Sequence, residues 1–234
     1  MDLNHELNQL KEKLIASGFV NKEDLEEEKS VFPFSHEEFL FSYLLHYEII
    51  SFEKYLSIRE QYYQENKYLH LFEMAPRSFG ETWGQKHLID IEPSFSIPTK
   101  NIDPSFDGEY DLIYNNIKIE VKASRAVEKK AGGSLTSKAL RANDDKKFDM
   151  NFQQLKPKLC DVYIWLGVWR DEIKYWVLSS NEVINNKYYT PGQHRGNEGE
   201  GQLWIKHSNV EEFNDYLVNE NELLEKVVEK ASIG

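Results

Sequence analysis

Residues 106–126, FDGEYDLIYNNIKIEVKASRA, predict a tight β-hairpin that carries charged side chains. Two runs rich in Ile, Leu, Tyr and Val, 109–114 and 117–123, flank Asn115 and Asn116. Asparagine tolerates the positive φ angles that a two-residue hairpin turn requires. Strand interiors disfavour Asp and Glu, so the acidic residues in these runs need a compensating partner.

The turn fixes which side chains face each other. With Asn115-Asn116 as the loop, Asp111 faces Glu120 and Glu109 faces Lys122. Side chains alternate along a strand, so Lys118 is expected on this polar face as well. The other face is expected to be core, with Tyr110, Leu112, Tyr114, Ile117, Ile119 and Val121. Two carboxylates that face each other repel, unless one is protonated or a cation lies between them.

A divalent cation would remove this repulsion. Mg²⁺ prefers oxygen ligands, so the sequence predicts a Mg²⁺ site, in which Mn²⁺ can substitute, made by Asp111, Glu120 and the backbone carbonyl of Val121. Lys122 would lie beside the ion, where it could orient a water or stabilise developing negative charge. This set of groups suits the hydrolysis of a phosphodiester.

Two other interpretations of these charges compete. In the first, the hairpin is only a solvated surface, in which Glu109 pairs with Lys122 and Lys118 screens the carboxylates. In the second, the motif is the similar spacing of Asp161 and Glu172. We expect the second to fail, because Glu172 would lie at the turn of its own hairpin and could not face Asp161.

Length and composition indicate a globular protein. The chain has 234 residues, 40% of them hydrophobic, enough for one large domain or a domain with a helical extension. The polar start, MDLNHELNQLKEKL, lacks the apolar stretch of a signal peptide. The longest apolar run, 162–169, is too short to cross a bilayer. The single cysteine, Cys160, excludes an internal disulfide and is expected in the core. We therefore expect a cytoplasmic protein without a membrane partner.

The charge is unevenly distributed along the chain. The net charge is −12, which by itself argues against a nucleic-acid partner. Residues 118–158, however, hold 11 Lys and Arg against 5 Asp and Glu, between strongly acidic flanks. Such a segment can bind phosphates locally while the rest of the protein resists non-specific adhesion. A chance fluctuation on a solvated surface is the alternative.

The remaining elements predict an α/β fold with a central mixed sheet flanked by helices. Residues 1–75 are expected as an N-terminal helical region packed on the core, and 76–234 as the core with a C-terminal helix. Helices are expected at 2–17, from a Ser35 cap through 64, from a Ser78–Glu81 capping box, at 134–158 and at 209–231, and strands at 161–169, 172–180 and 203–207. The aromatic residues of the strand pair, Tyr163, Trp165, Trp169 and Trp176, are expected in the core.

At 105–125 the chain resembles the PD-(D/E)xK nuclease superfamily, with Asp111, Glu120 and Lys122 at the motif positions. The whole arrangement looks most like a type II restriction endonuclease, which implies a restriction-endonuclease-like core. The sequence departs from the motif at Tyr110, which stands where the name-giving proline would be. Asp107 is therefore a rival for the first acidic position.

The resemblance implies a Mg²⁺-dependent, sequence-specific double-stranded DNA endonuclease that leaves 5′-phosphate ends. It further implies a prokaryotic cytoplasmic homodimer that is paired functionally with a DNA methyltransferase. A repair, nicking or junction-resolving nuclease is the nearest alternative, and a non-catalytic DNA-binding module is the alternative from another class.

Secondary site residues follow from the resemblance and from the basic segment. Glu81 either contacts the metal or serves only as the capping partner of Ser78. The candidate DNA contacts are polar residues that follow the hairpin or lie in the glycine-rich loop 187–202, each with a plain surface role as its alternative. They are Lys129, Lys130, Lys138, Arg141, Lys146, Lys147, Gln153, Gln154, His194 and Arg195. Gln153 and Gln154 are expected on a helix.

Overall fold

The structure, a computed structural model, describes residues 3–22, 36–192 and 200–233. The chain divides into two compact units, Met1–Lys67 and Tyr68–Gly234. This division precedes the boundary expected at residue 75, and it gives the short helix η1 (Leu69–Phe72) to the second unit. The packing of the helical region on the core stays a prediction.

The first unit contains the helices α1 (Leu3–Ala16), α3 (His36–His46) and α4 (Phe52–Glu65). The leucines of α1 recur on one helix face and are buried with apolar residues of α3 and α4, as their spacing predicts. The single helix expected through residue 64 is wrong. Glu48 has a φ of 55°, and Ser51 caps α4 by accepting a hydrogen bond from the Lys54 N–H. The expected cap Ser35 lies outside the described residues.

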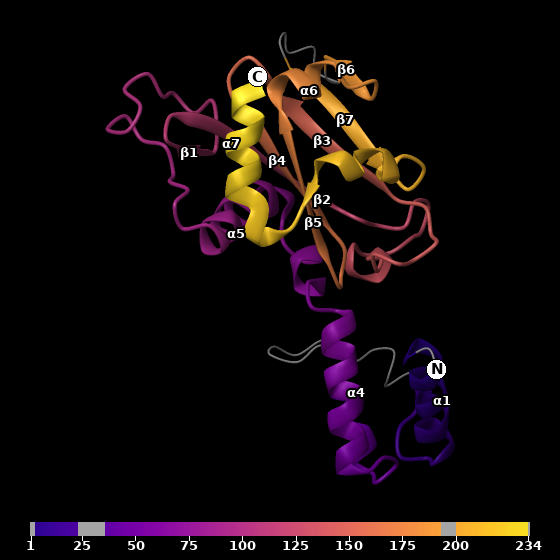
Figure 1. Cartoon of the computed structure of the whole chain (residues 1–234). Helices are drawn as coiled ribbons and strands as arrows, with labels where there is room; N and C mark the ends of the chain where they lie inside the picture. Colours follow the sequence, from indigo (N-terminus) through magenta and orange to yellow (C-terminus); the bar gives the residue numbers. More distant parts are fainter. Residues whose placement is uncertain (1–2, 23–35, 193–199, 234) are drawn as a thin grey trace. The chain divides into compact units, whose positions relative to one another are not determined.

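The second unit contains two β-sheets (Figure 1). The five-stranded sheet has the order β1-β2-β4-β5-β8, and the three-stranded sheet has the order β3-β7-β6. β2 and β4 are parallel whereas the other neighbours are antiparallel, so the larger sheet is mixed, as expected. The strands are β1 (Leu112–Tyr114), β2 (Ile117–Arg125), β3 (Asp149–Leu155), β4 (Val162–Val168), β5 (Ile173–Ser179), β6 (Tyr189–Pro191), β7 (Gly201–Lys206) and β8 (Leu217–Val218).

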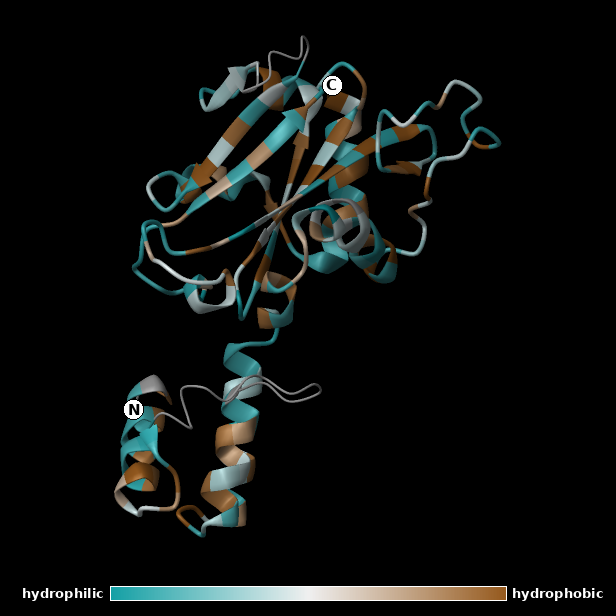
Figure 2. Ribbon diagram, turned by 180° about the vertical axis from the view of Figure 1, so that it is seen from behind, coloured by the Kyte–Doolittle hydropathy of each residue, from teal (hydrophilic) through white to brown (hydrophobic). Residues whose placement is uncertain are grey.

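The two faces of the larger sheet are covered differently. Helices cover one face, where Leu88 and Val227 pack against Val121 and Ile164 in what we call the helix-side core. The three-stranded sheet covers the other face, and there the sheet-side core contains Phe152, Tyr163 and Trp165 of β4, and Trp176 of β5. Figure 2 shows the alternation of polar and apolar residues along the outer strands. Every residue of β4 is buried, which confirms the expected core positions of Tyr163 and Trp165. Trp169, Trp176 and Cys160 are buried as well, as expected.

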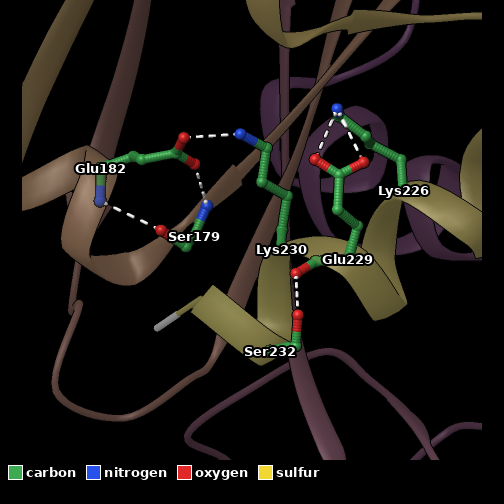
Figure 3. A network of polar contacts seen from close by, with 6 residues as sticks. All are labelled: Ser179, Glu182, Lys226, Glu229, Lys230 and Ser232. Atoms are coloured by element: carbon green, nitrogen blue, oxygen red, sulfur yellow. Dashed lines mark hydrogen bonds and ion pairs between the residues drawn. The ribbon is translucent and has the colours of Figure 1, made fainter.

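The helical elements of the second unit are short. They are η1, the π-helix η2 (Ser78–Trp83), α5 (Gly84–Ile91), η3 (Thr136–Lys138), α6 (Ser180–Ile184), η4 (Val210–Tyr216), η5 (Glu220–Glu222) and α7 (Leu223–Ile233). Polar contacts fasten α7 to the end of β5 (Figure 3). The Lys230 ammonium contacts the Glu182 carboxylate at 2.5 Å, and Glu182 also forms a capping box with Ser179.

Three expected helices differ in the structure. Residues 209–231 do not form one helix, because Leu217 and Val218 pair with β5. Ser78 follows Arg77, whose φ of −65° and ψ of −49° are already helical, so Ser78 does not begin the helix as the expected cap. Residues 134–158 form η3 and β3 instead of helices, because the apolar residues Phe148, Met150 and Phe152 recur with the strand period of two.

The described residues at the two ends of the glycine-rich segment 187–202 form a strand pair. Tyr189, Thr190 and Pro191 of β6 pair with the beginning of β7, and the expected strand at 203–207 is confirmed as β7. No helix among the described residues has the length and apolarity needed to cross a membrane.

Candidate active site

The predicted hairpin is present with the predicted register. Ile113 pairs with Lys118 and Tyr114 with Ile117 across a turn at Asn115-Asn116, whose φ angles are 45° and 68°. Both turn residues therefore adopt the left-handed conformation that asparagine tolerates. The paired register ends at Leu112 with Ile119, and the Asp111 N–H donates to the Ile119 carbonyl at 3.0 Å.

The alternation of faces breaks at Asp111. β1 begins at Leu112 and not at the expected residue 109. Tyr110 is buried, but it lies in the sheet-side core, whereas Leu112 lies in the helix-side core. The Tyr110 hydroxyl donates to Asp103 at 2.8 Å. The expectation that Tyr110 and Leu112 share a face is wrong, because the chain bends at Asp111 before the regular strand begins.

This bend turns the Asp111 carboxylate toward the edge of β2. Its Oδ2 accepts a hydrogen bond from the Val121 N–H at 2.8 Å, as a strand carbonyl would do in a longer β1. Because the N–H and C=O of one strand residue point to the same side, the Val121 carbonyl is directed to this edge too. The Val121 carbonyl, which the sequence predicts as a metal ligand, therefore lies on the side of β2 that faces Asp111.

Gln85 in α5 holds the second oxygen of Asp111. Its amide donates to Asp111 Oδ1 at 2.7 Å. The preceding residue, Gly84, allows the helix to approach β2 closely, since an added Cβ would lie 3.3 Å from Val121 Cγ1. Sequence reasoning missed Gln85. In the sequence, Gln85 is visible only as an amide residue that follows Gly84 in an amphipathic helix. This pattern does not identify Asp111 as the partner of Gln85.

Beside Asp111, the buried Glu120 pairs with the half-buried Lys122. Glu120 is only 8% exposed, and its Oε1 lies 2.6 Å from the Lys122 ammonium. Burial raises the pKa of Glu120 to about 7, although the Lys122 charge lowers it and the Asp111 charge adds to the rise. The Lys156 charge also lowers the pKa of Glu120. Lys156 is therefore a second lysine near the site that sequence reasoning missed.

The competing interpretations of the hairpin do not match the structure. Glu109 accepts a hydrogen bond from the Asp107 N–H at 2.7 Å and does not pair with Lys122. Lys118 pairs with Asp103 at 3.2 Å, and its charge also helps to lower the pKa of Glu109. The side chain of the rival Asp107 is 87% exposed and lies 3.9 Å from Lys100. Asp111 is the acidic residue that lies against β2.

The second acidic spacing fails as predicted. β4 pairs with β5 so that Val162 faces Ser179, which leaves Glu172 at the turn. Asp161 instead serves the fold, because its Oδ2 accepts a hydrogen bond from the Lys118 N–H at 2.8 Å.

The donor set suits a hard divalent cation. Asp111 and Glu120 supply carboxylate oxygens, and the Val121 carbonyl is directed to the same edge, which are ligand types that Mg²⁺ prefers. A buried carboxylate whose pKa is raised partly by another carboxylate gains from an added positive charge. Within residues 3–22, 36–192 and 200–233, no group of three or more His, Cys, Asp or Glu side chains could hold a metal. Glu81 lies in η2, before Gln85, and its side chain lies outside the described part.

The candidate DNA contacts divide into three groups. Lys129, Lys138 and Lys147 come together, since the backbone of Lys129 pairs with that of Lys147, and that of Glu128 with that of Lys138. Their neighbours Lys130, Lys146 and Arg141 belong to the same pair of loops. Lys129 pairs with Asp149, Lys146 with Glu128 and Arg141 with Asp144.

The other candidates lie elsewhere. Gln153 and Gln154 are exposed residues of the strand β3, so their expected position on a helix is wrong. The strand forms because the inward residues around them are large and apolar, and β7 pairs with it. His194 and Arg195 lie outside the described residues.

A scan of this chain against protein-family models gives no match, and a search of the curated proteins gives none either. Any functional assignment must therefore come from the site itself.

Proposed function

We propose that this protein is a metal-dependent nuclease that hydrolyses phosphodiester bonds of DNA, with a restriction-endonuclease-like core. One observation supports it most. The Asp111 carboxylate is fixed on β2 by the Val121 N–H and Gln85, near enough for its charge to act on the buried Glu120, which pairs with Lys122. Surface hairpins have no need of such an arrangement, in which the Asp111 charge adds to the cost of ionising the buried Glu120.

Asp111, Glu120 and the Val121 carbonyl would hold Mg²⁺, and Mn²⁺ can take its place. When bound, the ion supplies positive charge that activates a water nucleophile and neutralises charge on the phosphate. Gln85 keeps the Asp111 carboxylate in one orientation, which is the role of an outer hydrogen bond to a metal ligand. Glu81 remains a candidate additional ligand on the same helical segment.

Lys122 provides the fixed positive charge of the site. Its ammonium lies on Glu120, so it is held in place before a substrate arrives. From there it can donate a hydrogen bond to a water or to a phosphate oxygen while negative charge develops.

The substrate and assembly follow from the resemblance and from the basic loops. We propose double-stranded DNA cut at specific sites with 5′-phosphate ends, as in type II restriction enzymes, by a cytoplasmic homodimer that works alongside a DNA methyltransferase. The segments that carry Lys129, Lys138 and Lys147 would contact phosphates. A repair, nicking or junction-resolving nuclease would use the same site.

Plasmid cleavage with Mg²⁺ tests the proposal. The wild-type chain should cut supercoiled plasmid, and EDTA should abolish the cutting. Asp111→Ala, Glu120→Gln and Lys122→Ala should each lower the rate at least a hundredfold while the far-UV circular dichroism stays unchanged. Asp107→Ala is the matched control, an exposed carboxylate near Asp111, and should retain the wild-type rate.

The outcome also separates the alternatives. Discrete fragments indicate restriction-type cleavage, whereas nicked circles, a smear or preferred cutting of four-way junctions indicate the other nucleases. A chain that binds Mg²⁺ and DNA but cuts neither plasmid nor junction would leave only the non-catalytic module. Loss of cutting in Asp107→Ala alone would move the site to Asp107.

A further inference from the structure

β3 contains a bulge at Gln153-Gln154 that its pairing with β7 reveals. Phe152 pairs with Leu203, but the next pair is Leu155 with Gly201, so the β3 side has one residue more. Gln154 takes up the difference with a φ of 55°. A positive φ is uncommon for a residue other than glycine and costs free energy, and such residues cluster at functional sites.

The bulge changes which residues reach the surface. Met150, Phe152 and Leu155 are buried in the sheet-side core. In an unbroken strand, position 154 would point inward like 150 and 152. The extra residue places two consecutive glutamines, Gln153 and Gln154, on the exposed side. Bulges often reorient side chains next to active sites in this way.

The bulge lies along β2 at the level of the candidate active site. A bridge between Glu128 and Phe148 starts an antiparallel path of β3 beside β2. The Asn151 N–H then donates to Ser124 Oγ at 3.2 Å. After the bulge, Lys156 lies close enough for its charge to act on Glu120. β3 therefore runs alongside β2 from the level of Ser124 toward the level of Glu120. Gln153 and Gln154 fall at the level of Lys122, which lies between Ser124 and Glu120 in β2.

We propose that this bulge is the base-reading element of the site, and that Gln153 and Gln154 bind the edge of an adenine in the major groove. The inference rests on the proposed DNA substrate. A glutamine amide offers one donor and one acceptor, which match the acceptor N7 and the donor N6 of adenine. Strands can enter the major groove. The lysine loops that follow β2 would then position the duplex without reading its sequence.

Selection of bound duplexes from a randomised pool tests this, in EDTA so that cleavage plays no part. Wild type, Gln153→Ala, Gln154→Gly and the control Gln64→Ala are compared. Glycine accepts the positive φ without strain, so Gln154→Gly keeps the bulge and removes only the amide. Gln64 is an exposed glutamine of α4 that pairs with Glu60.

The wild type and Gln64→Ala should enrich the same motif containing an adenine. Each of the two bulge variants should lower the preference for that adenine about tenfold or more, with binding to unrelated duplexes unchanged. An unchanged motif in both variants, an equal loss of binding to all duplexes, or no motif for the wild type would each overturn the inference.

Plasmid cleavage with the same preparations separates this inference from the proposed function. If the wild type cuts DNA in Mg²⁺ and the bulge variants keep its motif, base reading by the bulge is wrong and the nuclease stands. If the adenine preference depends on the bulge but no variant or wild type cuts any DNA, the nuclease is wrong and the base-reading element stands.

Discussion

Glu120 is the residue whose chemistry the fold alters most within the candidate site. Its pKa is raised from 4.5 to about 7, mainly by burial. The folded protein therefore binds this proton more tightly than the unfolded chain does. The stability that comes from this group is fully present below pH 4.5 and is lost as the pH rises through about 7. At full ionisation the loss is on the order of 3 kcal/mol.

This loss predicts that Glu120→Gln is more stable than the wild type in alkaline, metal-free buffer. Urea unfolding in EDTA between pH 4.5 and 8.5 measures the difference. We expect the gap between the two proteins to widen with pH, because only the wild type must ionise a buried carboxyl group. Parallel curves would contradict the raised pKa of Glu120 and the burial that causes it.

Individual residues also show the limits of the sequence. That Asp111 lies against β2 could be predicted, because the two-residue turn sets the register up to Leu112 and Ile119 and thereby brings Asp111 to the same edge. Gln85 could not be found, because its contact with Asp111 depends on how closely α5 approaches β2 at Gly84. Such approach distances are set by the packing of the whole layer and not by any local pattern.

At the level of elements, the hairpin turn is the feature with the clearest energetic test. Asn116 has a φ of 68°, which a β-branched side chain adopts only under strain. We expect Asn116→Val to lower the free energy of unfolding by about 1–3 kcal/mol, and Asn116→Gly to retain or raise it, since Asn-Gly is a preferred pair in this turn.

Chemical denaturation of the two Asn116 variants measures this difference. If the valine variant unfolded at the wild-type denaturant concentration, the turn would not have the left-handed conformation that sets the register. In that case Leu112 would no longer pair with Ile119, Asp111 would not be brought to the edge of β2, and the argument for a shared metal site would lose its basis.

The elements predicted correctly are those whose pattern has one period throughout. The leucines of α1 and the apolar runs of β4 and β5 are such cases. β3 was missed because its period of two stops at the bulge, where Gln153 and Gln154 follow each other before Leu155. The polar residues before and after the bulge then resemble the exposed face of a helix. The break in the pattern hid the strand, and we propose that the same break serves substrate recognition.

For the whole molecule, the distribution of buried residues predicts two independent folding units. The core of the first unit draws on residues between Leu3 and Tyr62. The helix-side and sheet-side cores draw only on residues from Tyr68 onward. The buried residues of each unit therefore exclude water without residues of the other unit. Since burial of apolar surface is the main stabilising contribution, each unit should fold without its neighbour.

A chain that starts at Tyr68 tests this independence. We expect it to unfold in one cooperative thermal transition and to keep the near-UV circular dichroism of its tryptophans, because four of them, Trp165, Trp169, Trp176 and Trp83, belong to or pack against its two cores. The shortened chain should also keep the pH-dependent stability that Glu120 confers. A broad, non-cooperative transition, or exposure of these tryptophans in the fluorescence spectrum, would show that the first unit is required to complete the sheet that carries Asp111, Glu120 and Lys122.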